Sequence, residues 1–127
     1  MVKKYASLDI GLKRIGVAIC LTSNIVTPLE AILRKNRNQA SNDTLKVLNE
    51  WEIDTLVVGY PASSQEMQRR IDHFLTLLNF TGEVIKQNED MSSIEAEELL
   101  KGKIKHKRDG RIDSLAAKII LERYLAL

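Results

Sequence analysis

Two apolar runs near the N-terminus, residues 4–10 and 14–21, are separated by only three residues, Gly11-Leu12-Lys13. So short a connection predicts two neighbouring strands joined by a tight turn. Asp9 lies at the end of the first run. Because an ionised carboxylate is costly to bury, Asp9 needs a partner cation, a metal ion, backbone hydrogen bonds within the turn, or access to water.

After this hairpin, strand patterns and helix patterns alternate along the chain. A strand is expected over 25–33, followed by a helix carrying Leu45, Leu48 and Trp51 and by a strand over 54–61. Next comes a helix with the apolar face Met67, Ile71, Phe74, Leu75 and Leu78, and then a strand over 82–89. The last two elements are a helix from Ser92 to about Leu100 and a helix over 112–125. Two of the helices are expected to begin with capping boxes, which have the spacing of Ser63–Glu66 and Ser92–Glu95.

The order of these elements predicts a mixed sheet. Three strands with short connections favour an antiparallel meander, and the strand–helix units that follow favour parallel strands. Pro28 is tolerated in the third strand only near a sheet edge or a bulge. We therefore predict an α/β fold in which a single domain, residues 1–127, contains a mixed five-stranded sheet, three strands in a meander and two parallel, flanked by helices.

Positive charge is concentrated in one segment, residues 101–111. KGKIKHKRDGR holds six Lys/Arg and one Asp, whereas the whole chain of 127 residues has a net charge of only +2. Such a segment is typical of a contact with a polyanion, and a solvated loop is an equally common explanation. The single cysteine, Cys20, cannot form an internal disulfide, and no apolar run suits a signal peptide or a membrane span. We therefore expect a cytoplasmic protein.

Three acids, Asp9, Glu89 and Asp113, stand where predicted elements begin or end. Each has a simple explanation of its own, because Asp9 suits a turn, Glu89 precedes a helix, and Asp113 suits a first helical turn. Asp113 also falls within the apolar arc of the last helix, where a carboxylate is expensive. Strand ends and a helix start can meet at one end of a sheet. Oxygen ligands without His or Cys suit Mg²⁺ or Mn²⁺, so we predict that Asp9 is a metal ligand.

Four segments, LDIGLKRIGVAI, LVVGYP, NEDMSSIEA and RIDSLAAKIILERYL, follow one another along nearly the whole chain. This pattern resembles the YqgF-type Holliday junction resolvase family, whose members have an RNase H-like fold and are assigned to processing of the 5′ end of pre-16S ribosomal RNA. The resemblance implies that Asp9, Glu89 and Asp113 are the catalytic and metal-binding acids. The chain departs from the family where Asn88-Glu89-Asp90 replaces the usual Asp-Glu-Arg, which removes a cation beside Glu89.

The expected reaction is hydrolysis of a nucleic-acid phosphodiester, in which two Mg²⁺ or Mn²⁺ ions held by the three acids activate water. Other side chains would hold the flanking phosphates. These are Lys13, Arg14, Ser63, Lys103, Lys105, Lys107 and Arg108. For Arg14, a structural salt bridge is an equal alternative.

Other functions stay open at this point. The nucleic acid is either structured RNA or the branched DNA that a Holliday junction resolvase cleaves. The protein is either a monomer or a dimer. The altered triplet Asn88-Glu89-Asp90 is also compatible with a catalytically weak binding module on the same fold. The residues alone do not assign roles to Asp90 and His106. A sugar-kinase or actin-like ATPase shares Asp-Ile-Gly, but such enzymes close two lobes around ATP and need a longer chain.

Overall fold

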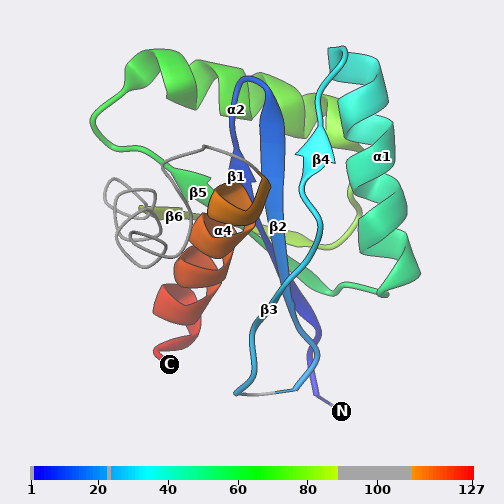
Figure 1. Ribbon diagram of the computed structural model, residues 1–127, viewed down its shortest axis with the longest axis vertical. Helices are drawn as coiled ribbons and strands as arrows, with labels where there is room; N and C mark the ends of the chain where they lie inside the picture. The colour runs from blue at the N-terminus through cyan, green and yellow to red at the C-terminus, as the bar shows by residue number, and fades with distance from the viewer. Residues whose placement is uncertain (1, 23, 89–109) are drawn as a thin grey trace.

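The computed structural model describes residues 2–22, 24–88 and 110–127 (Figure 1). The elements are, in chain order, β1 (Tyr5–Ile10), β2 (Arg14–Cys20), β3 (Thr27–Pro28), β4 (Ile32–Leu33), α1 (Arg37–Glu50), β5 (Thr55–Tyr60), α2 (Gln65–Leu78), β6 (Glu83–Asn88) and α4 (Gly110–Leu125). The helix predicted from Ser92 to Leu100 lies outside the described residues. None of the helices in the described ranges has the length and apolar character needed to cross a membrane.

The strands form one mixed sheet, as predicted, in the order β3–β2–β1–β5–β6, with β4 also paired to β2. β1 and β2 are the antiparallel hairpin, and Asp9 lies opposite Gly16 in their ladder. β5 runs parallel to β1, and β6 runs parallel to β5. Because these three strands share one direction, their carboxyl ends lie at the same end of the sheet, which is where ligands commonly bind in open α/β sheets.

The third strand is interrupted. Ala18 of β2 is opposite Pro28 of β3, whereas Arg14 of β2 is opposite Leu33 of β4. Three residues, 29–31, therefore lie opposite only two residues of β2, 16 and 17. The one extra residue between β3 and β4 makes a β-bulge. The strand predicted over 25–33 thus becomes two short pieces on the same side of β2, and the sheet has six strands rather than five. Pro28 lies in β3, at the edge of the sheet order, where no further strand requires the N–H that proline lacks.

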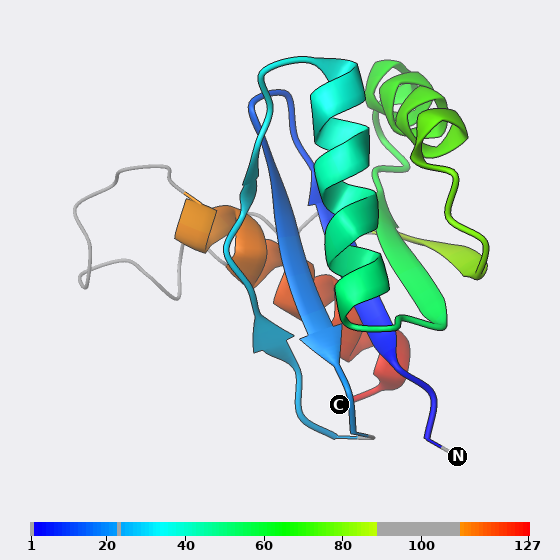
Figure 2. The same cartoon turned by 90° about the vertical axis from the view of Figure 1, so that its right-hand side faces the viewer.

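Helices cover both faces of the sheet. α1 and α2 lie on one face and α4 lies on the other (Figures 1 and 2). Successive strand residues point to opposite faces, so each strand contributes to both layers. The layer under α1 and α2 holds large buried side chains, among them Leu8, Ile15, Leu56 and Phe74. The layer under α4 includes the smaller side chains Ala18, Cys20, Val57 and Ala117, which allow this helix to approach the sheet closely.

The start of α2 differs from the prediction, and for α1 the sequence pattern predicts no particular start. α1 begins with a capping box, in which the Asn36 side chain accepts a 2.8 Å hydrogen bond from the Gln39 N–H. At the start of α2 the cap is Ser64, whose hydroxyl accepts from the Met67 N–H at 3.3 Å. The capping box predicted for Ser63 and Glu66 is therefore wrong. The reason is a turn after Pro61, whose carbonyl accepts from the Ser64 N–H, so that the helix begins one residue later.

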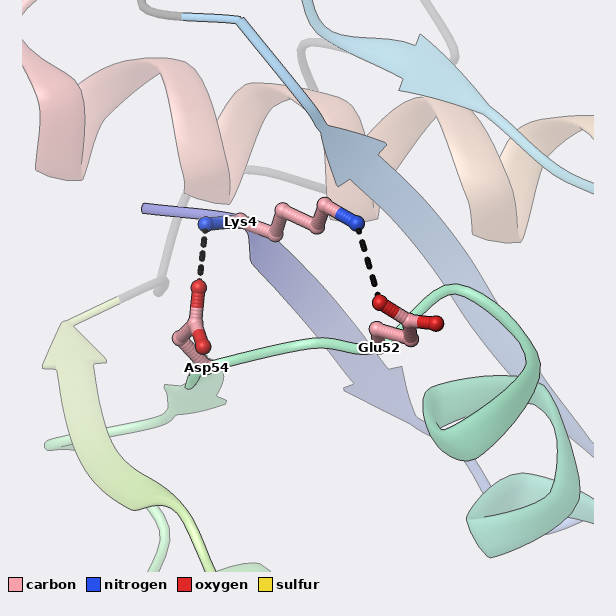
Figure 3. A network of polar contacts seen from close by, with 3 residues as sticks. All are labelled: Lys4, Glu52 and Asp54. Carbon is pink, nitrogen blue, oxygen red and sulfur yellow. Dashed lines mark hydrogen bonds and ion pairs between the residues drawn. The ribbon is translucent and has the colours of Figure 1, made fainter. Parts of the chain in front are cut away.

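Polar contacts connect the start of β1 to the loop before β5 (Figure 3). The Lys4 N–H donates a 2.8 Å hydrogen bond to Oδ2 of Asp54. In return, the N–H groups of Asp54 and Thr55 donate to the Lys4 carbonyl at 2.8 and 3.2 Å. The Lys4 ammonium lies 3.4 Å from Oε2 of Glu52. These contacts fix the parallel register in which Tyr5 pairs with Thr55, far from the carboxyl end of β1.

Candidate active site

Asp9 is the second-last residue of β1, next to the turn that leads to β2. It is 8% exposed, and strand alternation puts it on the same face as Ser7. The Ser7 hydroxyl donates a 2.6 Å hydrogen bond to the carbonyl of Ala117 in α4, so this is the face that α4 covers. Asp9 therefore lies at the carboxyl end of the sheet, on the side of α4.

Asp113 lies in the first turn of α4 and, taken as a whole residue, is 5% exposed. The helix comes so close to β2 at this point that a Cβ on Gly16 would overlap the backbone carbonyl of Asp113. The Val17 N–H also donates a 3.3 Å hydrogen bond to the Ser114 hydroxyl. Gly16 thus has Asp9 beside it in the ladder and the backbone of Asp113 packed over it. The backbone of Asp113 and the strand position of Asp9 are therefore both adjacent to Gly16.

Arg14, at the start of β2, forms an ion pair with Asp113. Its Nε donates a 2.8 Å hydrogen bond to Oδ2 of the carboxylate, and the two side chains are 27% and 8% exposed. A nearly buried carboxylate requires such a partner, since its desolvation would otherwise be unfavourable. The salt bridge expected as one of the two roles of Arg14 is therefore present, and it orients the Asp113 carboxylate.

The remaining predicted residues divide into two groups. Lys13 and Ser63 are exposed, Lys13 in the turn between β1 and β2 and Ser63 just before the cap of α2. The others lie outside the described residues; they are Glu89, Asp90, Lys103, Lys105, His106, Lys107 and Arg108. β6 ends at Asn88, directly before Glu89. Within residues 2–22, 24–88 and 110–127, no three His, Cys, Asp or Glu residues gather in a way that would hold a metal ion.

A polar cluster joins α2 to the carboxyl ends of β5 and β6. The Tyr60 hydroxyl donates a 2.9 Å hydrogen bond to Oδ2 of Asp72, and the Lys86 ammonium lies 2.8 Å from Oδ1. The same ammonium lies 4.7 Å from the centre of the Tyr60 ring. Hydrogen bonding with Lys86 lowers the pKa of Asp72 and raises that of Lys86. The cluster therefore holds β6 against α2 two residues before the strand ends.

Gly16 is the functional position that the sequence reasoning missed. It stands inside the apolar run RIGVAI, and a glycine within a strand often marks the close approach of another backbone. That signal was present in the sequence. The partner that approaches, the first turn of α4, lies about a hundred residues further along and is not indicated by local pattern.

The chain is similar to a known family over nearly its whole length. A family model described as "RuvX: Holliday junction resolvase" matches residues 3–127. A protein of Sulfurovum sp. is 58% identical over 127 residues, which cover 98% of this chain and 99% of the relative. A protein of Sulfurimonas denitrificans is 54% identical over 125 residues, covering 96% of both chains. Both relatives are named "Putative pre-16S rRNA nuclease".

Two solved structures of a viral enzyme are similar in fold. The crystal structure of the fowlpox virus Holliday junction resolvase has a TM-score of 0.60 at 17% identity, covering 97% of this chain and 98% of that one. The complex of fowlpox virus resolvase with substrate Holliday junction DNA has a TM-score of 0.55 at 18% identity, covering 97% of both. This likeness concerns the fold, an RNase H-like mixed sheet with the flanking helices described above.

Proposed function

The chain belongs to the RuvX family of Holliday junction resolvases, which are enzymes that cleave phosphodiester bonds, and we propose that it is a metal-dependent nuclease that processes the 5′ end of pre-16S ribosomal RNA. The observation that supports the nuclease proposal is that Asp9 and the backbone of Asp113 are both adjacent to Gly16, at the carboxyl end of the sheet. The names of the two relatives, which are more than half identical to this chain, support the choice of RNA. A ribosomal RNA precursor as substrate would place the protein in the cytoplasm.

The donor set at this site fits Mg²⁺ or Mn²⁺. Asp9 and Asp113 offer only carboxylate oxygens, which these hard cations prefer. We propose Glu89, which follows the last residue of β6, as the third acid. Two divalent ions bound there would activate water and stabilise the attacking and leaving oxygens of the phosphodiester.

The protein's own side chains would position the substrate around these acids. Arg14 keeps the Asp113 carboxylate in one orientation through its 2.8 Å hydrogen bond. Lys13 is exposed in the turn, directly before Arg14 of β2. Its ammonium would bind a backbone phosphate there. We propose the same role for Ser63 and for Lys103, Lys105, Lys107 and Arg108. Contacts of this kind give affinity and register without reading the base sequence.

Resolution of branched DNA is the second candidate function, because the matching family model is described as a Holliday junction resolvase. Cleavage of a four-way junction generally requires two active sites and hence a dimer. The two functions share the acids and the reaction. They differ in the nucleic acid that is accepted and in the oligomeric state.

The test is a cleavage assay on four substrates: an RNA spanning the 5′ end of 16S rRNA in its precursor, a four-way DNA junction, single-stranded RNA and single-stranded DNA. Each is incubated with Mg²⁺, with Mn²⁺ or with a chelator. We expect cleavage of the precursor RNA that requires the metal. Cleavage of the junction alone would establish the resolvase instead. Binding of RNA without cleavage under any condition would contradict the proposal and indicate a binding module.

A further inference from the structure

An arginine-lined hollow lies across the β1–β2 turn from the acids, on the face that α1 and α2 cover. It has a volume of about 410 Å³ and is bounded by the end of β1, the start of α1 and one side of α2. Figure 2 shows these three segments meeting at one end of the molecule. Ile10 lines the hollow, and Asp9 precedes it in β1. Since successive strand residues point to opposite faces, the hollow and the acids lie on opposite sides of the same strand end.

The lining of this arginine hollow is strongly cationic. Four arginines contribute to it, Arg34, Arg37, Arg69 and Arg70, together with one acid, Glu66. Glu66 lies 3.0 Å from Arg70. In the part of the chain that the structure describes, this is the sole ion pair formed by any of the four. Such a concentration of like charge is unfavourable unless an anion joins it.

Arg34 is held rigidly at the centre of this cluster. Its Nη1 donates a 2.7 Å hydrogen bond to the carbonyl of Gly11, in the β1–β2 turn. Its guanidinium lies 5.5 Å from the centre of the Phe74 ring. Burial, followed by repulsion from Arg70 and Arg37, lowers the pKa of Arg34. A fixed guanidinium is well suited to phosphate, because its planar set of N–H donors matches two phosphate oxygens at once.

The cationic surface continues beyond the hollow. A second hollow of about 420 Å³ shares Leu12, Arg34 and Arg37 with it and adds Lys35. Lys13 adjoins these residues, because its carbonyl accepts a 2.8 Å hydrogen bond from the Arg34 N–H. Basic residues thus follow one another around the hairpin turn, as a basic track. An extended polyanion would use a track of this kind, whereas a single small anion needs only one end of it.

We propose that the arginine hollow binds a backbone phosphate of the same nucleic-acid strand that presents its scissile phosphodiester to Asp9 and Asp113. The strand would pass over the β1–β2 turn, with Lys13 between the two points of contact. The hollow would then fix the position of the strand relative to the acids. The identity of the strand rests on the proposed function, whereas binding of phosphate in the hollow does not.

The test measures binding of precursor RNA without divalent metal, by fluorescence anisotropy over a series of salt concentrations. The variant carries Arg37→Gln and Arg69→Gln, both exposed positions, and leaves Arg34 in place because it contacts Gly11 and Phe74. The control carries Lys3→Gln and Lys46→Gln, which removes the same charge from exposed sites outside the hollow. We expect the variant to bind the RNA about 10-fold more weakly than the wild type. The slope of its log binding constant against log salt concentration should be smaller by about 1–2. The control should bind much like the wild type.

Three results would overturn the inference. The first is equal weakening in the variant and the control, which would mean that only net charge matters. The second is unchanged binding of RNA by the variant. The third is a nucleoside monophosphate that binds the wild type, fails to bind the variant and does not compete with RNA, which would make the hollow a nucleotide site. Failure of the nuclease proposal is seen separately, as the absence of cleavage by the wild type.

Discussion

Arg14 and Asp113, 99 residues apart, are joined by a hydrogen bond of 2.8 Å between Nε and Oδ2. The bond connects the start of β2 to the first turn of α4 and holds a carboxylate that is almost fully enclosed. One of the three proposed catalytic acids is therefore oriented by a residue of the hairpin that carries another of them, Asp9.

Replacing Arg14 tests this relationship. Arg14→Gln removes the cation but keeps much of the volume, and we expect the free energy of unfolding to fall by about 1.5–3 kcal/mol, as for hydrogen bonds to charged groups. The control is Lys118→Gln on the same helix, whose pair with Glu122 at 3.1 Å is more exposed and should contribute less than about 1 kcal/mol. Chemical denaturation measures both. Equal losses in the two variants would contradict a special role for Arg14.

Gly16 should tolerate no side chain. In Gly16→Ala the Cβ would overlap the carbonyl of Asp113, and the first turn of α4 would have to move away from β2. We expect a loss of about 1–3 kcal/mol, typical of overpacking, together with a loss of cleavage at temperatures where the variant is folded.

Gly82→Ala is the matched control for Gly16→Ala. Its Cβ would meet the carbonyl of Asp54 and the ring of Phe80, so it also destabilises the protein, but at the opposite end of the sheet from the acids. We expect the folded Gly82→Ala protein to cleave at the wild-type rate. A Gly16→Ala protein that cleaves equally well would show that the approach of α4 to β2 does not place Asp113.

Stability should depend on pH through Asp72. Its hydrogen bonds with Lys86 and Tyr60 lower its pKa below the usual 3.8, so the folded state favours the ionised form. This stabilisation is fully present above the usual pKa and is lost as the pH falls through the lowered value. We expect Asp72→Asn to cost less than about 1 kcal/mol near neutral pH, because the pair is half-exposed. The difference from the wild type should vanish in strong acid, and a difference that persists there would contradict this origin. Thermal unfolding across the pH range measures it.

Much of the fold follows from local pattern. The short Gly11-Leu12-Lys13 connection specifies the hairpin, and the apolar run ending at Tyr60 specifies a strand that is covered on both faces. The interruption of the third strand was harder to predict, because a bulge depends on how residues 29–31 meet β2 and not on their own sequence. The start of α1 was missed although Asn36 and Gln39 have the side chains of a capping box, since the surrounding polar residues also suit a loop.

Local pattern also indicates two residues of the candidate site. Asp9 and Asp113 stand out because a carboxylate at a strand end or on an apolar helix face requires compensation. The residues that bring them together are less visible, because Gly16 and Arg14 act through contacts with a distant helix. The arginine hollow is likewise assembled from three segments. The stretch RKNR, residues 34–37, is visibly basic, but no local pattern places it beside Arg69 and Arg70 of α2.

The measurement that tests the central claim most directly is metal-dependent cleavage by Asp9→Asn and Asp113→Asn, compared with Asp43→Asn. The first two remove a negative charge at the proposed site with little change in shape, and Asp43 is an exposed acid of α1 on the other face of the sheet. Circular dichroism would verify that all three are folded. We expect the rate of cleavage with Mg²⁺ to fall by about 10²-fold or more in the first two, as when other groups that stabilise a transition state are removed, and to be unchanged in the third. Wild-type rates in folded Asp9→Asn and Asp113→Asn would contradict the account.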